Sequence, residues 1–244
     1  MAVQEKTQPL AAEMAVPVST PGIQLWLRRV SIYVLGMFLL ALGVSFSIKS
    51  SLGVSPMNSL PYVISRIINV DMGIITTLIF SSYVVIQILL LRRNFKLKNL
   101  FQVLVASLFG TFVSLTNRLL VFPAPESYLL QLSLLAVSLI LIGLGIMFYL
   151  VGDLVPQPPE GLVMTIATKI DRPFSSVKVI FDCVIVSAAL LLSFLSGNGM
   201  MGVREGTLIA ALGIGRVIGL FSRWFRPALM TFCHGKNCTA QNIK

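Results

Sequence analysis

A polar interruption between apolar segments occurs twice and is the feature that most constrains the fold. The first copy, residues 49–66, reads KSSLGVSPMNSLPYVISR, and the second, residues 152–169, reads GDLVPQPPEGLVMTIATK. Pro56 aligns with Pro159 and Arg66 with Lys169, both at a spacing of 103. Each copy follows a long apolar segment and contains an apolar run too short to cross a bilayer as a helix. We therefore expect two halves, each built around one interruption.

Long uncharged stretches indicate a polytopic membrane protein. Of the 244 residues, 56% are hydrophobic and 11% are charged, whereas a soluble domain carries about 25% charged residues. Six stretches are long enough for a helix that crosses roughly 30 Å of hydrocarbon. They are residues 30–48, 72–91, 99–117, 127–152, 179–195 (which contains Asp182) and 206–222 (which contains Arg216).

The charges at the segment ends favour one of two topologies. If both short runs enter the membrane and return on the same side, most Lys and Arg residues lie on one side, as the positive-inside rule requires. If both cross, the chain has eight full spans in two parallel repeats, and the basic loop 92–98 lies outside. We therefore expect an all-α membrane protein with two inverted repeats, each of three spanning helices plus one short re-entrant helix. Eight full spans remain the alternative.

The predicted transmembrane domain covers residues 28–225, with repeat one at 30–120 and repeat two at 127–225. Residues 1–27 are polar and predict a disordered arm, and residues 226–244 predict a tail. Both ends are expected on the cytoplasmic side of a bacterial cytoplasmic membrane. The tail carries Cys233, His234 and Cys238, an odd spacing for metal ligands, so neither a metal nor a cofactor is expected. Because the basic residues lie at segment ends, nucleic-acid binding is not expected.

Three segments carry a resemblance to a known family. SLGVSPMNSLPY at 51–62, GIITTLIFSSYVVIQILLLRR at 73–93 and REGTLIAALGIGRVIG at 204–219 resemble the YczE/YitT-type family of bacterial integral membrane proteins. The resemblance covers roughly residues 30–225. It implies the membrane class, and it identifies neither a substrate nor a functional residue.

Arg216 is a charge near the centre of the last apolar stretch. A charged side chain at the bilayer centre costs from about 3 kcal/mol upward. We therefore expect Arg216 to face the protein interior. There it either pairs with Glu160, Asp153 or Asp182, or contacts an anionic substrate; a shifted span would instead let it snorkel to the interface.

The two short helices begin with polar residues. Ser55-Pro56 and Pro158-Pro159 are helix-start signals. Glu160 follows in the first turn, where it either neutralises the helix dipole or serves as a coupling carboxylate; its counterpart at the spacing of 103 is Met57. The amide of Asn58 offers both a donor and an acceptor. The predicted substrate-binding residues are Ser55, Asn58, Glu160 and Arg216, and the coupling or ion-pair candidates are Glu160, Asp182 and Asp153.

Other polar residues within the spans have simpler interpretations. Asp182 follows Lys178 by four residues, which favours a local ion pair. Asp153 is expected at the rim of the membrane or as a cap. Gln87, Gln102 and Asn117 are expected to form interhelical hydrogen bonds.

The pattern as a whole favours a transporter over an enzyme. No catalytic or nucleotide-binding motif occurs in the sequence, so any transport is secondary or energised by a separate subunit. We expect a permease that holds a small anionic or zwitterionic solute between two half-helix N-termini at mid-membrane. The alternative is a non-transporting scaffold or accessory protein that binds a partner or lipid. A homo-oligomer is compatible with both functions.

Overall fold

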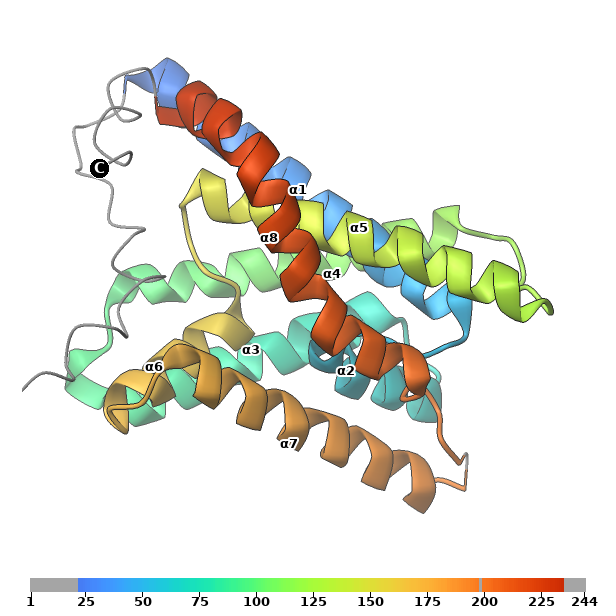
Figure 1. Ribbon diagram of the computed structural model, residues 1–244. Coiled ribbons are helices and arrows are strands. Elements are labelled where there is room, and N and C mark those ends of the chain that lie inside the picture. The colour runs from blue at the N-terminus through green and yellow to red at the C-terminus, as the bar shows by residue number, and fades with distance from the viewer. Residues whose placement is uncertain (1–21, 198, 235–244) are drawn as a thin grey trace, which may run out of the picture.

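Residues 22–197 and 199–234 are described by a computed structural model, and within them the chain folds into helices without a strand. The helices, labelled in Figure 1, are α1 (Ile23–Ser50), α2 (Pro56–Ile68), α3 (Met72–Leu91), α4 (Phe101–Leu119), α5 (Tyr128–Gly152), α6 (Pro158–Lys169), α7 (Phe174–Leu195) and α8 (Glu205–His234). Two 3-10 turns, Arg92–Asn94 and Leu97–Leu100, connect α3 to α4.

Six of these helices are long and apolar enough to cross a membrane, namely α1, α3, α4, α5, α7 and α8. The other two are short, because α2 has 13 residues and α6 has 12. At 1.5 Å per residue they measure roughly 18–20 Å, well below a hydrocarbon thickness of about 30 Å. The described residues therefore have six candidate spans, and α2 and α6 are each shorter than a span.

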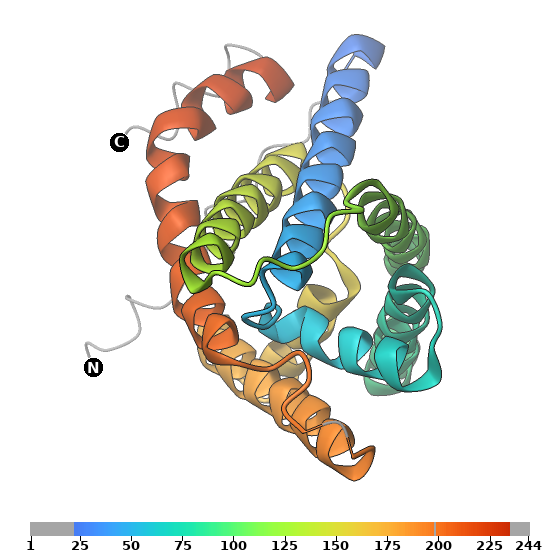
Figure 2. The same cartoon turned by 90° about the vertical axis from the view of Figure 1, so that its right-hand side faces the viewer.

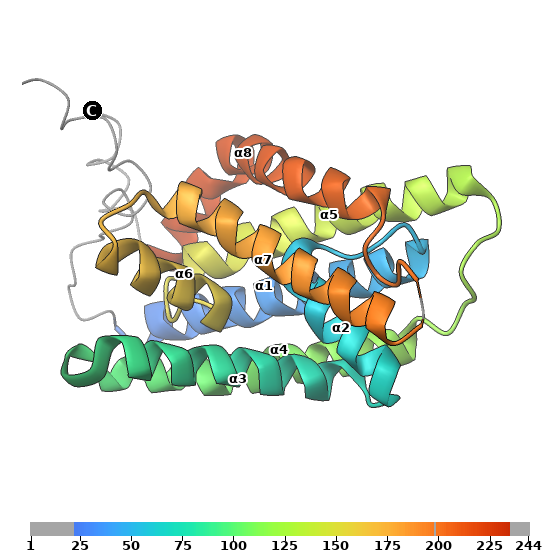
Figure 3. The ribbon, with the colours of Figure 1, turned by 90° about the horizontal axis from the view of Figure 1, so that it is seen from below.

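The segment that contains each short helix enters and leaves the bundle at the same end. Ser51, before α2, and Asn69, after it, line the same cavity. At the opposite end, the carbonyl of Gly152, before α6, accepts a hydrogen bond from Arg29, and Lys169 in the last turn of α6 donates to the carbonyl of Leu90. Figure 3 shows the two short helices towards opposite ends of the bundle. We call these the α2 end and the α6 end.

The first helices of the two halves, α1 and α5, pack against each other in opposite directions (Figure 2). Gly36 lies against Gly145, and further along α1 Gly43 lies against Ser138. A Cβ atom on Gly145 would lie 2.7 Å from the Gly36 carbonyl oxygen, and one on Gly43 would lie 3.0 Å from the Ser138 carbonyl oxygen. The glycines therefore allow the two backbones to approach closely, the usual basis of helix association in lipid.

A second close contact joins α3 to α4 through Gly73 and Gly110. A Cβ atom on either glycine would overlap the carbonyl oxygen of the other. At the spacing of 103 residues, the counterpart of Gly110 is Gly213 in α8, where a Cβ atom would meet only Leu139 of α5, at 3.4 Å. The corresponding pair of the second half, α7 and α8, diverges towards the α6 end (Figure 1). The two halves thus differ in how tightly their last two helices pack.

The short helices begin at the predicted residues. Ser55 is the N-cap of α2 with Pro56 at the first helical position, and Pro158 is the first residue of α6. Because Pro56 and Pro158 hold the same position, the two halves correspond here at a spacing of 102 (158 − 56) rather than 103. By position in the helix, the counterpart of Glu160 is Asn58, whereas the alignment of Pro56 with Pro159 pairs it with Met57. A match of proline with proline could not distinguish Pro158 from Pro159.

Helices extend beyond the predicted domain boundaries at both ends. α1 begins at Ile23, inside the predicted arm 1–27, and α8 continues past residue 225 to His234. The guanidinium of Arg28 lies 5.0 Å from the ring centre of Phe232, so the last turns of α8 pack on the start of α1. Residues 1–21 and 235–244, which include Cys238, lie outside the described residues.

Replacing Gly145 by alanine tests the contact between α1 and α5. The added methyl would have to move two backbones apart, and such overpacking costs typically 1–3 kcal/mol. We expect Gly145→Ala to lower the unfolding temperature of the purified protein in detergent. The matched control is Gly215→Ala in α8, where nothing lies within 4 Å of the added atom. Equal unfolding temperatures for the two variants would contradict this contact.

Candidate functional site

A polar cavity of about 450 Å³ lies at the α2 end of the bundle. Its volume falls within the range of about 300–1,000 Å³ that is usual for small-molecule sites. Four elements contribute to it: the end of α1, the last turns of α2, the start of α3 and the end of α4. The polar lining residues are Lys49, Ser51, Tyr62, Ser65, Arg66, Asn69, Asp71 and Asn117.

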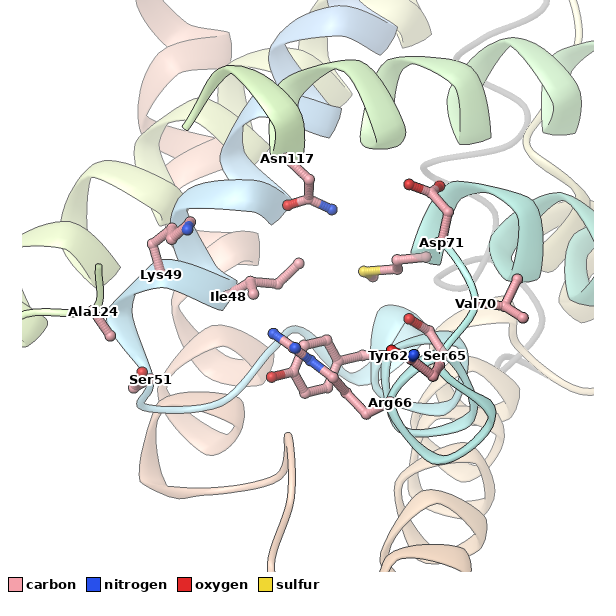
Figure 4. Close-up of a pocket in the computed structure, with 12 residues that line it drawn as sticks. Ile48, Lys49, Ser51, Tyr62, Ser65, Arg66, Val70, Asp71, Asn117 and Ala124 are labelled. Atoms are coloured by element: carbon pink, nitrogen blue, oxygen red, sulfur yellow. The ribbon is translucent and has the colours of Figure 1, made fainter. Parts of the chain in front are cut away.

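The charges of this cavity come from Lys49, Arg66 and Asp71 and sum to +1. Figure 4 shows Lys49 on α1 across the cavity from Asp71 at the start of α3, with Arg66 on α2 and Asn117 on α4 on the two remaining sides. Lys49 Nζ donates to the Phe122 carbonyl at 2.9 Å. This contact holds the Lys49 cation at the cavity wall, and the Arg66 guanidinium lies 5.3 Å from the ring centre of Tyr62.

Asp71 holds the start of α3 and connects it to α4. Its carboxylate accepts a hydrogen bond from the backbone N–H of Gly73 at 2.9 Å, which makes it an N-cap. The same oxygen accepts a hydrogen bond from the hydroxyl of Ser114 on α4. The one negative charge of the cavity is therefore fixed in position by two donors.

A smaller cavity of about 180 Å³ adjoins the first and shares Ile48, Ser51 and Tyr62 with it. It reaches Gly53 and Val54, the extended residues that lead into α2. The ring of Tyr62 packs against Gly202 so closely that a Cβ atom there would overlap it. Tyr62 thus stands between the two cavities, beneath the connection from α7 to α8.

At the other end of the bundle, Glu160 lies half-buried in the first turn of α6. Its carboxylate accepts a hydrogen bond from the hydroxyl of Tyr149 on α5. Tyr33 on α1 packs edge-on against Tyr149, with ring centres 6.1 Å apart, and its hydroxyl donates to the Val155 carbonyl at 2.8 Å. The residue before α6, Gln157, donates to the sulfur of Met37 near the middle of α1 at 3.2 Å.

Two buried amides hold the start of α6 against α3 and α4. Gln87 Nε2 donates to Gln102 Oε1 at 2.9 Å, and Gln102 Nε2 donates to Gln87 Oε1 at 3.3 Å. Gln87 Nε2 also lies 3.2 Å from the Pro158 carbonyl oxygen, to which it donates. The predicted interhelical hydrogen bonds of Gln87 and Gln102 are confirmed. Asn117 lies instead at the wall of the larger cavity.

The other predicted site residues do not form one cluster. Asn58 Nδ2 donates to Ser55 Oγ at 2.9 Å, and the Asn58 Oδ1 atom is buried without a hydrogen-bond partner. Among the described residues, no hydrogen bond or ion pair joins Asn58, Glu160 and Arg216 to one another. The structure brings Ser55 and Asn58 together in α2 and leaves Glu160 with Tyr149 at the α6 end.

Arg216 lies on the exposed surface of α8. The expectation that it faces the protein interior is wrong for the isolated chain. Only 6% of the apolar window of α8 is buried, so a central position in this segment does not by itself imply burial. Arg216 lines neither cavity, and among the described residues no ion pair joins it to Glu160.

Two ion pairs account for the remaining acidic candidates. Lys178 pairs with Asp182, as the spacing of four residues predicts. Asp153 ends α5 in the left-handed conformation, with φ of 46°, and its carboxylate lies 3.4 Å from the guanidinium of Arg29. Asp153 thus closes the connection between α5 and α1 at the α6 end.

The sequence interpretation missed the cavity residues and the partner of Glu160. Lys49 and Arg66 are two of the few basic residues expected outside, and this exception to the positive-inside pattern could have singled them out. Tyr149 could have been found because a phenol in an apolar span needs a hydrogen-bond partner. Asp71 could have been recognised from its place directly before an apolar span, where an N-cap is expected.

Comparison with known proteins assigns the chain to a family. A family model described as a family of unknown function, DUF6198, matches residues 27–223. The chain belongs to this family. It is 27% identical over 194 residues to a protein of Bacillus subtilis (strain 168) named "Uncharacterized protein YyaS", which covers 78% of this chain and 90% of that protein. No solved structure matches.

The DUF6198 match extends from α1 into α8 and so spans the apolar bundle. The matching family does not carry the YczE/YitT name, and that resemblance stays a prediction. Helical apolar spans make this member of DUF6198 an integral membrane protein.

Asp71→Ala tests how the negative charge of the cavity is held. The substitution removes an N-cap, which costs about 0.5–2 kcal/mol, and also the contact with Ser114. We expect a clearly lower unfolding temperature than for Ser114→Ala, which removes one of the two hydrogen bonds. The exposed Glu126→Ala serves as the control for loss of a carboxylate. If Asp71→Ala unfolds at the temperature of this control, the proposed bridge between α3 and α4 is absent.

Proposed function

We propose that this protein is a secondary transporter for a small anionic or zwitterionic solute in a bacterial cytoplasmic membrane. The observation that carries the proposal is the polar cavity at the α2 end, where Lys49 and Arg66 face a volume of about 450 Å³. A space of ligand size on which a few polar and charged groups converge is the usual candidate for a small-molecule site. A carboxylate or phosphate group of the solute would contact the two cations.

The charge pattern of the cavity further limits the solute. Lys49 and Arg66 attract an anionic group, while Asp71 keeps a carboxylate on the opposite side. A zwitterion satisfies both sides of the cavity, with its cationic group towards Asp71. A bare cation would meet two like charges, which disfavour its binding.

The proposed path continues from the larger cavity past Tyr62 into the smaller one and towards the start of α2. Ser55 and Asn58 lie there, and the buried Asn58 Oδ1 has no hydrogen-bond partner. A solute donor would supply that missing hydrogen bond, since a buried acceptor without a partner costs roughly 1–3 kcal/mol. Asn58 is therefore the proposed inner contact. Arg216 is not part of this path, because it is exposed on α8.

Two inverted repeats are the proposed basis of alternating access. The antiparallel contacts support this arrangement, because Gly43 touches Ser138 while Gly145 touches Gly36, and a shift of 102 residues exchanges these two contacts. The packing partners of the short helices support it as well, since α2 lies against α7 and α6 lies against α3. Inverted halves with short interrupted helices are common among secondary transporters.

The orientation follows from the basic residues at the α6 end. Arg28, Arg29, Arg92, Arg93, Lys96, Lys98, Lys169, Arg172, Lys178, Arg223 and Arg226 belong to segments at this end. The positive-inside rule then assigns the α6 end to the cytoplasm. The larger cavity consequently opens to the outside.

The exposed face of α8 favours a second candidate function, a scaffold that binds a partner in the membrane. Arg216 is exposed in an apolar helix, where a charge facing lipid costs at least about 2.5–3.5 kcal/mol. A partner helix with a carboxylate would remove this cost. Under the scaffold function, Arg216→Ala would dissociate a complex and leave solute binding at the cavity unaffected.

Variants of the two cavity cations test the transport proposal. A hydrogen bond to a charged group contributes about 1.5–3 kcal/mol, which corresponds to roughly a tenfold to hundredfold change in affinity. We expect Lys49→Ala and Arg66→Ala to weaken binding by at least about tenfold. Binding is measured as the rise in unfolding temperature when each member of a size-matched panel of carboxylates, amino acids and amines is added.

The control variant is Arg118→Ala, an exposed arginine in the last turn of α4 that does not line the cavity. It should bind as the unmodified protein does. Binding of amines alone, or identical affinities for the Lys49, Arg66 and Arg118 variants, would contradict the proposed site.

A further inference from the structure

The transport proposal makes no use of Glu160, although this carboxyl group is the one acidic side chain in the first turn of a short helix. It lies half-buried at the start of α6, and its hydrogen bond comes from the Tyr149 hydroxyl. Among the described residues, no lysine or arginine forms an ion pair with it. A buried carboxylate without a cation is costly when it is ionised.

The elements around Glu160 supply few groups that could stabilise a negative charge. On α1, the Tyr33 hydroxyl donates to the Val155 carbonyl instead. On α7, Lys178 lies within electrostatic range of Glu160, but it pairs with Asp182. The negative charge of Asp182 disfavours a second negative charge on Glu160.

The nearest amides on α3 and α4 are also engaged elsewhere. Gln87 donates to Gln102 and to the Pro158 carbonyl, while Gln102 donates back to Gln87. Tyr149 is thus the one hydrogen-bond donor to Glu160 that the described residues provide.

A second observation concerns Gln157, the residue before α6. Its side chain is fully buried, and its Oε1 atom has no hydrogen-bond partner. Gln157 is the N-cap of α6, and Glu160 follows three residues later in the first turn of the same helix. A protonated carboxyl would bring an O–H donor to this place, whereas an ionised carboxylate brings none.

We propose that Glu160 is a proton-binding site, with Tyr149 as its fixed hydrogen-bond donor and Gln157 as the acceptor for the bound proton. The proton comes from water at the α6 end and binds one carboxylate oxygen, while the other oxygen keeps the hydrogen bond from Tyr149. The corresponding position of the first half holds Asn58, which does not titrate. Proton binding is therefore a property of the second half alone.

Coupling of this proton to solute movement rests on the proposed transport function, but proton binding itself does not. Burial raises the pKa of Glu160 above its ordinary value, and the hydrogen bond from Tyr149 and the charge of Lys178 oppose this rise. Protonation removes a buried charge that is otherwise unpaired. Release of the proton restores that charge and favours exposure of α6, which is how a proton could drive a change of conformation.

Infrared difference spectroscopy of the full chain in a lipid film, titrated with protons alone, tests the site. The carbonyl stretch of the protonated carboxyl should persist to pH values at which an ordinary glutamate, whose pKa is about 4.3, is already ionised. We expect this band to disappear in Glu160→Gln and to remain in Glu126→Gln, a matched change at an exposed glutamate. The proposal would be overturned by a band that survives in Glu160→Gln. It would also be overturned if the band of the unmodified protein titrated with the midpoint of an ordinary glutamate.

Tyr149→Phe separates proton binding from a merely structural role. Because the Tyr149 hydroxyl stabilises the ionised form, its removal should move the titration midpoint of the Glu160 band to higher pH. An unchanged midpoint would show that Tyr149 does not act on this carboxyl. No solute is needed, so this experiment can fail while the cavity variants succeed, and the reverse also holds.

The pH dependence of stability gives an independent readout with a defined sign. A carboxyl whose folded-state pKa is raised contributes stability that is present below its unfolded pKa and is lost as pH rises through the folded value. The unfolding temperature of the unmodified protein should therefore fall, relative to Glu160→Gln, as pH rises above about 4.3. A constant difference between the two proteins across this pH range would contradict the proposed site.

Discussion

The antiparallel contact between α1 and α5 is the interaction on which the rest of the structure depends. Lipid provides no hydrophobic force between helices, so close backbone approach has to hold them together. Gly36, Gly43 and Gly145 permit that approach. Since α1 leads into α2 and α5 leads into α6, the antiparallel pair directs the two short helices to opposite ends of the bundle. The cavity at the α2 end and the carboxyl at the α6 end both follow from this arrangement.

A second constraint is that backbone groups in a membrane need hydrogen-bond partners. The extended segments before α2 and α6 have no helical ladder, and polar side chains supply their donors. Arg204 donates to the Ser51 carbonyl, Ser47 to the Gly53 carbonyl and Tyr33 to the Val155 carbonyl. These polar residues therefore support the short helices. Asn58 and Gln157 keep buried oxygens without partners, and this is why a ligand and a proton are proposed at those places.

The features that sequence could predict depend on length and local chemistry. Uncharged stretches predict the spans, Ser55-Pro56 predicts the start of α2, and the spacing of Lys178 and Asp182 predicts their ion pair. Features that depend on tertiary packing were not predictable in this way. An apolar helix gives no sign of its buried face, so Arg216 was expected inside, and a cavity formed by the ends of four elements has no local signature. The single-residue shift that pairs Asn58 with Glu160 required the observed helix starts.

The most direct test of the proposed inverted arrangement is accessibility labelling of single cysteines in the last turns of the two short helices. Arg66 and Lys169 are both exposed and lie in the last turns of α2 and α6. Arg66→Cys and Lys169→Cys would each be placed in a chain whose Cys183, Cys233 and Cys238 are replaced by serine. In intact cells, an impermeant maleimide should label position 66 directly and position 169 only after permeabilisation. Labelling of both positions from the same side would contradict the inverted arrangement.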